Sequence, residues 1–204
     1  MAKSRPINYV RVAEVLTELD MITLVNAQGV VDRFGDLAHE ELTPHHHIAS
    51  ALESFGVAVC IHADDVDFAD AHYEWLLEEA ASLTGGKVTV GNFRFDRDHE
   101  DEDDPEGDDE DDREKDGRGV LHFECNGKEL SFLIEQESND YLDMGAAQAA
   151  IEALGSDDDP RSFRCVDNGS RNPLGTIDDV MVLATAEQRE GLRRHLGITF
   201  HEPW

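Results

Sequence analysis

The residues of this chain that could bind a metal ion are histidines and carboxylates in its first half. Three histidines stand in a row near the start of a predicted helix, namely His45, His46 and His47. Neighbouring residues on a helix point about 100° apart, so no more than two of the three could easily share one ion. A solvated or partly packed helix start is the alternative interpretation. His62, at the end of a predicted strand and followed by Asp64 and Asp65, is a better place for a site, and these three residues are the metal candidates. Because no second ligand for His62 can be identified, we expect no metal site.

The other histidine and cysteine side chains favour packing over chemistry. Cys60, Cys125 and Cys165 are odd in number, lack CxxC spacing and lie in apolar or alternating segments, which predicts reduced core residues. His72 lies in an apolar helical stripe beside Trp75, where a hydrogen-bonded core histidine is more common than a metal ligand.

An enzyme is one of three hypotheses for the function of this chain, and a binding protein is the preferred one. The sequence contains no GxSxG, HExxH, P-loop or GxGxxG motif. Glu124 and Glu129 are predicted to face each other across a hairpin, which is mildly destabilising unless water, an arginine or a cation separates them. We expect no catalytic residue and no cofactor. The alternative is a hydrolytic or metal-assisted site near His62, or between His122 and the polar loop Asp167–Ile177.

The most acidic part of the chain is the segment Asp96–Asp116, which holds 15 acidic and 3 basic residues. It has no aliphatic or aromatic side chain, so burial cannot offset the loss of backbone entropy on ordering, and its like charges repel. We therefore predict a long disordered acidic loop over residues 96–118. The segment does not fit an EF-hand calcium loop, because Arg113 stands where the last carboxylate ligand belongs, and only diffuse binding of Ca²⁺ or Mg²⁺ is expected.

The charge of the chain predicts a basic protein as partner. The formal net charge is −29, and outside the acidic segment 31 of the 46 acidic residues still face only 14 of the 17 basic ones. Such a surface repels nucleic acid and anionic lipid and attracts basic proteins. A GC-rich genome or a high-salt cytoplasm would also explain the background acidity, but it explains the concentrated segment less well. The predicted partner-binding residues are Asp101, Asp103, Asp104, Asp108, Asp109, Asp111, Asp112, Arg171 and Asn172.

The sequence predicts a cytoplasmic protein that neither spans nor binds a membrane. No long apolar segment follows the basic residues near the start, and nowhere do enough apolar residues follow one another to cross a bilayer. The oligomeric state cannot be inferred from these patterns.

Residues 1–95 are expected to form an N-terminal half with helices and strands. The helices follow apolar residues at i, i+3, i+4 and i+7, as in Val12, Val15, Leu16 and Leu19. Because Val57–Ile61 is continuously apolar, we expect a central strand that is covered on both faces. The elements predicted in this half are helices at Asn8–Leu19, Thr43–Gly56 and Asp67–Leu83, a strand pair within Met21–Phe34, and strands at Val57–Ile61 and Lys87–Phe95.

Residues 119–204 are expected to form a C-terminal half that opens with a hairpin. Asn126-Gly127 suits a type I′ turn, and counting outward from it pairs Phe123 with Leu130. The other elements predicted here are a helix at Asp140–Leu154, strands at Ser162–Val166 and Asp179–Leu183, and a last helix that begins with the capping box Thr185–Gln188 and ends at Gly197. Helices mixed with a hairpin predict an α+β fold with a mixed or antiparallel sheet, as one compact unit or two closely packed halves.

The segments YLDMGAAQAAIEALG and VMVLATAEQREGLRRHLGI, within residues 119–199, have an arrangement that resembles the immunity proteins of bacterial polymorphic toxins. These are small, acidic, cytosolic α+β proteins. The resemblance implies that the partner is a toxin with a basic active-site cleft, which the chain masks by steric and electrostatic occlusion. An acidic scaffold that binds many basic proteins, as a histone-chaperone tail does, is a third hypothesis.

Overall fold

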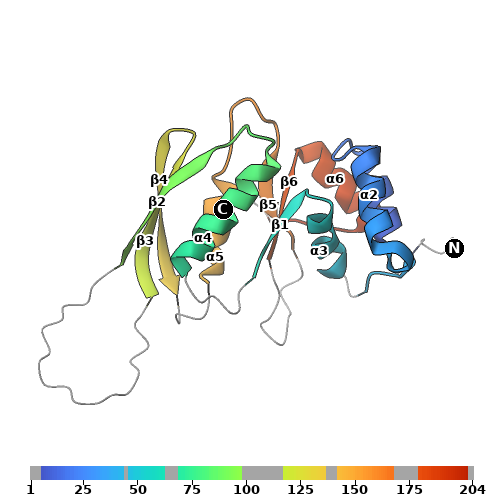
Figure 1. The fold of residues 1–204 in the computed structure, drawn as a ribbon, viewed down its shortest axis with the longest axis horizontal. Helices are drawn as coiled ribbons and strands as arrows, with labels where there is room; N and C mark the ends of the chain where they lie inside the picture. Colours follow the sequence, from blue (N-terminus) through green and yellow to red (C-terminus); the bar gives the residue numbers. More distant parts are fainter. Residues whose placement is uncertain are drawn as a thin grey trace, which may run out of the picture.

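The computed structural model describes residues 6–43, 46–62, 69–97, 117–136, 142–167 and 179–201, and for residues 46, 69, 70, 117 and 136 it describes the backbone only. The described residues form an α+β fold with two antiparallel three-stranded sheets, as predicted (Figure 1). The helices are α1 (Tyr9–Glu18), α2 (Leu24–Phe34), η1 (Gly35–His39, a 3₁₀ helix), α3 (His46–Ser54), α4 (Ala69–Leu83), α5 (Met144–Glu152) and α6 (Ala186–Leu196). The strands are β1 (Ala58–Ile61), β2 (Val90–Arg97), β3 (Gly117–Cys125), β4 (Lys128–Gln136), β5 (Ser162–Cys165) and β6 (Asp179–Ala184).

Sheet A has the strand order β1-β6-β5 and is buried on both faces. Successive residues of a strand point to opposite faces, so Val59 and Ile61 belong to one core, and Ala58 and Cys60 to another. The first core lies against α4, α5 and sheet B, and the second against α1, α3 and α6. Because β1 comes from the first half of the sequence and β6 from the second, sheet A joins the two halves.

The predicted position of β1 within its sheet is wrong. All four of its residues are buried, as its apolar sequence indicates, but β1 is an edge strand of sheet A and β6 is the central one. A continuous apolar run reports burial on both faces, and helices cover both faces of this edge strand. The apolar sequence therefore predicted the strand and its burial correctly, but it did not predict the position of β1 in the strand order of sheet A.

Sheet B has the order β2-β3-β4 and contains the predicted hairpin. Asn126 and Gly127 have φ angles of 52° and 78°, which fits a type I′ turn. Phe123 lies opposite Leu130 as expected. Gly119 faces Phe95 and the Asp96 backbone closely, since a Cβ at Gly119 would lie 2.8 Å from the Asp96 carbonyl oxygen.

The strand pair predicted within Met21–Phe34 is wrong, because this segment forms helix α2. The Thr23 side chain accepts a hydrogen bond from the Asn26 amide and caps the helix. Ala27, Val31 and Phe34 recur at helical spacing and pack toward α1. The strand-pair interpretation placed a turn near Ala27 to Gly29, but these residues lie in the interior of a helix.

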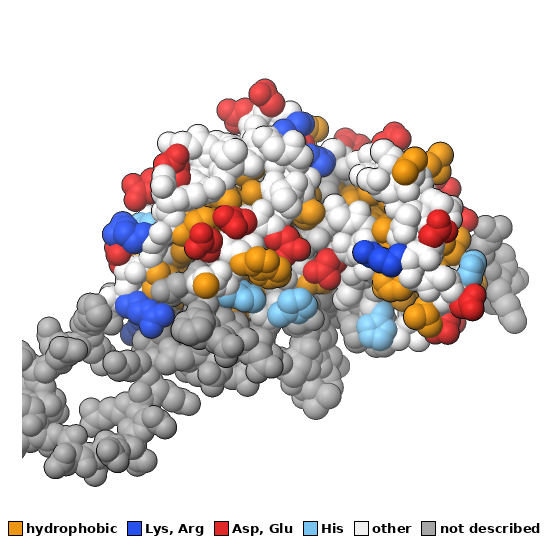
Figure 2. All heavy atoms as spheres, in the orientation of Figure 1, with side chains coloured by type: hydrophobic (Ala, Val, Ile, Leu, Met, Phe, Trp, Pro, Cys, Tyr) orange, Lys and Arg blue, Asp and Glu red, His pale blue; other side chains and the backbone are white. Residues whose placement is uncertain are grey.

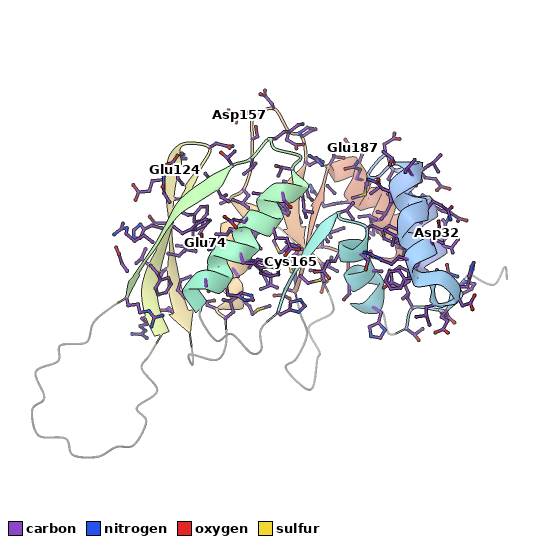
Figure 3. All side chains as sticks on the ribbon, in the orientation of Figure 1. Asp32, Glu74, Glu124, Asp157, Cys165 and Glu187 are labelled. Carbon is purple, nitrogen blue, oxygen red and sulfur yellow. The ribbon has the colours of Figure 1, made fainter. Side chains whose placement is uncertain are left out.

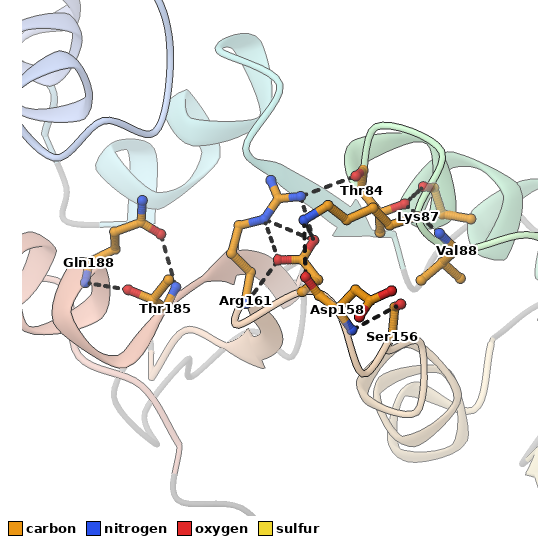
Figure 4. Close-up of polar contacts among 10 residues, drawn as sticks. Thr84, Lys87, Val88, Ser156, Asp158, Arg161, Thr185 and Gln188 are labelled. Atoms are coloured by element: carbon orange, nitrogen blue, oxygen red, sulfur yellow. Dashed lines mark hydrogen bonds and ion pairs between the residues drawn. The ribbon is translucent and has the colours of Figure 1, made fainter.

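The other predicted helices agree with the structure except for one buried stripe. In α4 the stripe is Tyr73, Leu76, Leu77 and Ala80, while Trp75, which was predicted to face inward, is 49% exposed. The capping box of Thr185 and Gln188 begins α6 as predicted (Figure 4). Gly197, in the left-handed conformation, ends it as predicted. No helix in the described ranges is long and apolar enough to cross a membrane.

Several predictions fall outside the described residues. These are the helix starts at Pro44, Asp67 and Asp140, the acidic segment between Arg97 and Gly117, and residues 168–178 of the polar loop. The start of α3 is described only from His46 onward.

Candidate functional site

Helices α1 and α2 form a hairpin at one end of the molecule. Asn8 caps α1 by accepting from the Arg11 amide at 2.9 Å, and Asp20 takes a left-handed φ of 54° in the connection to α2. The rings of Tyr9 and Phe34 stack with centroids 4.0 Å apart and fix the open end of the hairpin. Only Ala27 of α2 is buried, so most of this helix faces outward.

A groove of about 340 Å³ runs between the two helices. Leu24 and Thr17 also line a second hollow of about 570 Å³, which extends toward Phe55 and Gly56. The two hollows therefore meet at Leu24 and Thr17. We call the two hollows together the α1–α2 groove. The part between the helices is lined by Val10, Ala13, Glu14, Thr17 and Glu18 of α1 and by Leu24, Ala27, Gln28 and Val31 of α2.

Two of the most exposed large apolar side chains lie at the start of α2, where the two hollows of the groove meet. Leu24 is 73% exposed, Val25 80% and Leu37 58%, whereas the other large apolar side chains with such exposure among the described residues are Trp75 and Leu133. Figure 2 shows orange side chains at the outer surface of the α2 end, with red acidic ones around them. Isolated exposed apolar residues are ordinary, but Leu24 and Val25 are neighbours at the start of α2 and form the apolar part of a candidate interaction surface, whereas Leu37 belongs to η1.

The groove has an acidic rim. Glu14 and Glu18 stand on its α1 side, and Asp32, labelled in Figure 3, accepts a hydrogen bond from Gln28 at 2.7 Å on the α2 side. Arg11 is 3.0 Å from Glu14 and neutralises part of that charge. Between Tyr9 and Glu41 the sequence has seven acidic and two basic residues, so the surface favours a cationic ligand.

The metal candidates are only partly described. His62 is exposed at the end of β1, while Asp64 and Asp65 lie outside the described residues. No group of three His, Cys, Asp or Glu side chains in the described part of the chain could hold a metal ion. The side chains of His45 and His46 are also outside it, and His47 is exposed.

His72 is partly buried, as its place in a helical stripe suggested. Its Nε2 atom is shielded from solvent and has no hydrogen-bond partner among the described residues, and the same holds for Glu79 Oε2. Burial, followed by the charge of His62, lowers the pKa of His72. Burial, followed by the nearby Glu53, raises the pKa of Glu79. Both side chains are therefore held toward their neutral forms.

The outer face of sheet B carries a chain of polar contacts. Ser131 Oγ lies 2.8 Å from His122 Nδ1, and Asp96 Oδ2 lies 3.3 Å from His122 Nε2. Arg94 also pairs with the Asp96 carboxylate. Serine, histidine and aspartate in one chain are the residue types of a hydrolytic triad, although here the aspartate contacts Nε2 and the serine Nδ1.

The predicted repulsion between Glu124 and Glu129 is relieved by neighbours on β2. The two residues face each other across the hairpin, as expected. Asn92 donates to Glu124 at 2.8 Å, and Arg94 lies 3.9 Å from Glu129. This face is thus a cross-strand polar network in which opposite charges alternate.

All three cysteines are buried thiols that form no disulfide, which confirms the prediction of reduced core residues. Burial raises the pKa of Cys165 to about 12 and also raises that of Cys125. Protonated, shielded thiols are poor nucleophiles and poor metal ligands.

The sequence-predicted partner residues and the groove lie apart. The acidic segment leaves sheet B at Arg97 and returns at Gly117, at the opposite end of the molecule from α2 (Figure 1). Arg171 and Asn172 lie outside the described residues. His122 belongs to sheet B and Asp167 follows β5 of sheet A, so the predicted site between them would have to span two sheets.

No protein-family model, no curated protein and no solved structure matches the chain. The resemblance to immunity proteins therefore stays a prediction. Sequence reasoning missed the groove because it read α2 as strands. The signal that could have found it is the helical recurrence of Leu24, Ala27, Val31 and Phe34, with Val25 left over on the outer face.

Proposed function

We propose that this chain is an acidic binding protein that engages and masks a basic protein partner through the α1–α2 groove. The observation that carries the proposal is Leu24, a largely exposed leucine that lines both hollows of a groove with an acidic rim. Apolar anchors in a recess, surrounded by complementary charge, are typical of protein-binding surfaces.

Apolar contacts and charge have different roles in this proposal. Burying a leucine side chain stabilises a complex by about 1.5–3 kcal/mol, and because Leu24 is 73% exposed most of that burial is still available on binding. The acidic rim and the net charge of −29 mainly raise the association rate of a basic partner, and salt weakens this effect.

The acidic segment is proposed as a second contact with the same partner. Its attachment points at Arg97 and Gly117 are at the end of the molecule opposite to the groove. A partner that contacts both the groove and the acidic segment would therefore be covered over the length of this molecule. An immunity protein that masks a toxin is one form of this function. A scaffold that binds many basic proteins would use the acidic segment without needing the groove.

A small hydrolase is the second candidate function, favoured by the contacts among Ser131, His122 and Asp96. A serine activated by His122 would be labelled by a fluorophosphonate reagent, and His122→Ala would abolish the labelling. If the wild-type protein is not labelled, the contacts among Ser131, His122 and Asp96 serve only to stabilise sheet B. The metal-assisted version rests on Asp64 and Asp65, which lie outside the described residues.

The experiment that tests the proposed function is affinity capture from the native cytosol at low and moderate salt. Four baits are compared, namely the wild-type chain, Leu24→Ala, Val25→Ala, and a variant in which residues 98–116 are replaced by a Gly/Ser linker. We expect one basic protein, retained by the wild type and Val25→Ala near one-to-one and reduced for Leu24→Ala. A diffuse set of basic proteins that salt removes, with no difference between the two point variants, would contradict the proposal.

A further inference from the structure

The two walls of the α1–α2 groove have the spacing of helix surfaces that meet a third helix. Residues lining the groove on α1 recur at 10, 13, 14, 17 and 18, and those on α2 at 24, 27, 28 and 31. Both series follow i, i+3, i+4 and i+7, which is one continuous face of each helix. Helices pack by placing the side-chain ridges of one helix into the grooves of another. The ridges on α1 and α2, with a hollow between them, therefore form a surface onto which a third helix can pack.

The groove is long enough for about two turns of a guest helix, and a further hollow adjoins it. A smaller hollow of about 200 Å³, lined by Pro6, Val10, Glu14 and His39 among others, shares Val10 and Glu14 with the part between α1 and α2. The three hollows therefore lie along α1 and the residues that flank it. Within α1 the lining residues run from Val10 to Glu18, which at about 1.5 Å of rise per residue is roughly 12 Å, or about two helical turns.

A helix fits the backbone chemistry of this surface better than a strand does. The backbone groups in the middle of α1 and α2 are bonded within each helix, so the walls offer no free sheet edge to an extended peptide. A strand placed in the groove would leave its own amides and carbonyls without partners. A helix satisfies its backbone internally and needs only an apolar stripe to fill the groove.

Charge decides what kind of helix the groove takes. Glu14 and Glu18 are one turn apart on the same wall, so they face lysines or arginines that are one turn apart on a guest. A second copy of this chain is a poor occupant, because each copy carries a net charge of −29 and the two would repel. The rim therefore selects a cationic helix from another protein.

We propose that the α1–α2 groove binds a basic amphipathic α-helix of the partner, which packs onto α1 and α2 as the third helix of a bundle. The guest places apolar side chains on both sides of Leu24 and cationic side chains along Glu14 and Glu18. This inference rests on the proposed function and specifies that the part of the partner that binds the groove is an α-helix.

The test uses the full chain and two synthetic fluorescent peptides of identical leucine, lysine and alanine composition. In the first peptide the leucines recur at i, i+3, i+4 and i+7 with lysines on one flank, and in the second leucine and lysine alternate as in a strand. Fluorescence anisotropy at about 0.15 M salt screens diffuse attraction. We expect the helical peptide to bind at least about tenfold more tightly than the alternating one, a difference of about 1.4 kcal/mol.

Matched variants locate the binding. Leu24→Ala should weaken the helical peptide about tenfold, whereas Val25→Ala, equally exposed but outside the hollows, should change its affinity less than about twofold. Glu18→Gln should weaken it more than Asp157→Asn, an exposed carboxylate after α5 (Figure 3). Circular dichroism of each variant verifies that the fold is intact.

Four results would overturn the inference. The first three are equal binding of the two peptides, equal effects of Leu24→Ala and Val25→Ala, and loss of binding on replacement of residues 98–116 when Leu24→Ala leaves binding intact. The fourth is dimerisation of the chain that Leu24→Ala abolishes, because a second copy would then occupy the groove. If the captured partner binds through an extended segment, the inference that it presents a helix is wrong but the proposed function is not. If no partner is captured, the proposed function is contradicted, whereas the result of the peptide experiment is unaffected.

Discussion

Two helix glycines with different surroundings provide a direct test of how α6 holds α1. A Cβ built at Gly191 of α6 would lie 2.3 Å from Leu19 Cδ2 and 2.9 Å from Cδ1, whereas a Cβ at Gly29 of α2 would meet nothing within 4 Å. Both glycines are interior helix residues without positive φ. The substitutions Gly191→Ala and Gly29→Ala therefore share the same gain in helix propensity and differ in packing.

The expected magnitudes follow from these contacts. Replacing a helical glycine by alanine stabilises a helix by about 0.5–1 kcal/mol, which is the whole effect expected at Gly29. Overpacking opposes this gain by about 1–3 kcal/mol at Gly191, because the buried methyl group must displace the Leu19 side chain. We expect the free energy of unfolding of Gly191→Ala to lie about 1–3 kcal/mol below that of Gly29→Ala.

Urea unfolding followed by circular dichroism measures this difference through the midpoint at constant m value. For a chain of this size about 1 kcal/mol also shifts the melting temperature by about 2–4 °C. The double variant Leu19→Ala/Gly191→Ala is the control, because against a Leu19→Ala background the new methyl group should become neutral or stabilising. If Gly191→Ala were as stable as Gly29→Ala in the wild-type background, the close packing of α6 on α1 would be refuted.

Three further predictions concern buried titratable groups. The pKa of Asp159 is lowered to about 2, chiefly by its hydrogen bonds with Arg161. Asp159→Asn should therefore lower the free energy of unfolding by about 1–2 kcal/mol above pH 3.8, and in urea titrations this loss should fade as the pH drops toward 2. An effect that did not fade would contradict the ion pair. Because burial lowers the pKa of His72 below 6.5, the chain should lose stability as the pH falls below 6.5, and His72→Phe should remove that dependence in the same assay. A slope that His72→Phe left unchanged would assign it to other groups. The Cys165 thiol, with its pKa raised to about 12, should react with a disulfide reagent only on unfolding, and rapid reaction of the native chain would contradict its burial.

The elements that the sequence predicted well are those fixed by local rules. The register of the β3–β4 hairpin follows from the positive φ angles that Asn126 and Gly127 tolerate, and the start of α6 follows from the paired hydrogen bonds of Thr185 and Gln188. Each depends on residues close in sequence. No tertiary contact is needed to decide them.

The errors arose where tertiary packing decides the outcome. Helix α2 contains Asn26 and Gly29, which locally favour a turn, but Ala27 and its helical neighbours gain burial against α1. The edge position of β1 depends on pairing with β6, more than a hundred residues away. The groove could not be predicted for the same reason, because it exists only where α1 and α2 pack together.

Hydrogen–deuterium exchange of the chain with and without its captured partner tests the central claim most directly. If the partner binds the α1–α2 groove, amides of residues 9–34 should exchange more slowly in the complex, with the largest change in α2, whose residues are mostly exposed in the free chain. Protection confined to sheet B and the acidic segment, with residues 9–34 unchanged, would contradict the account and assign recognition to the opposite end of the molecule.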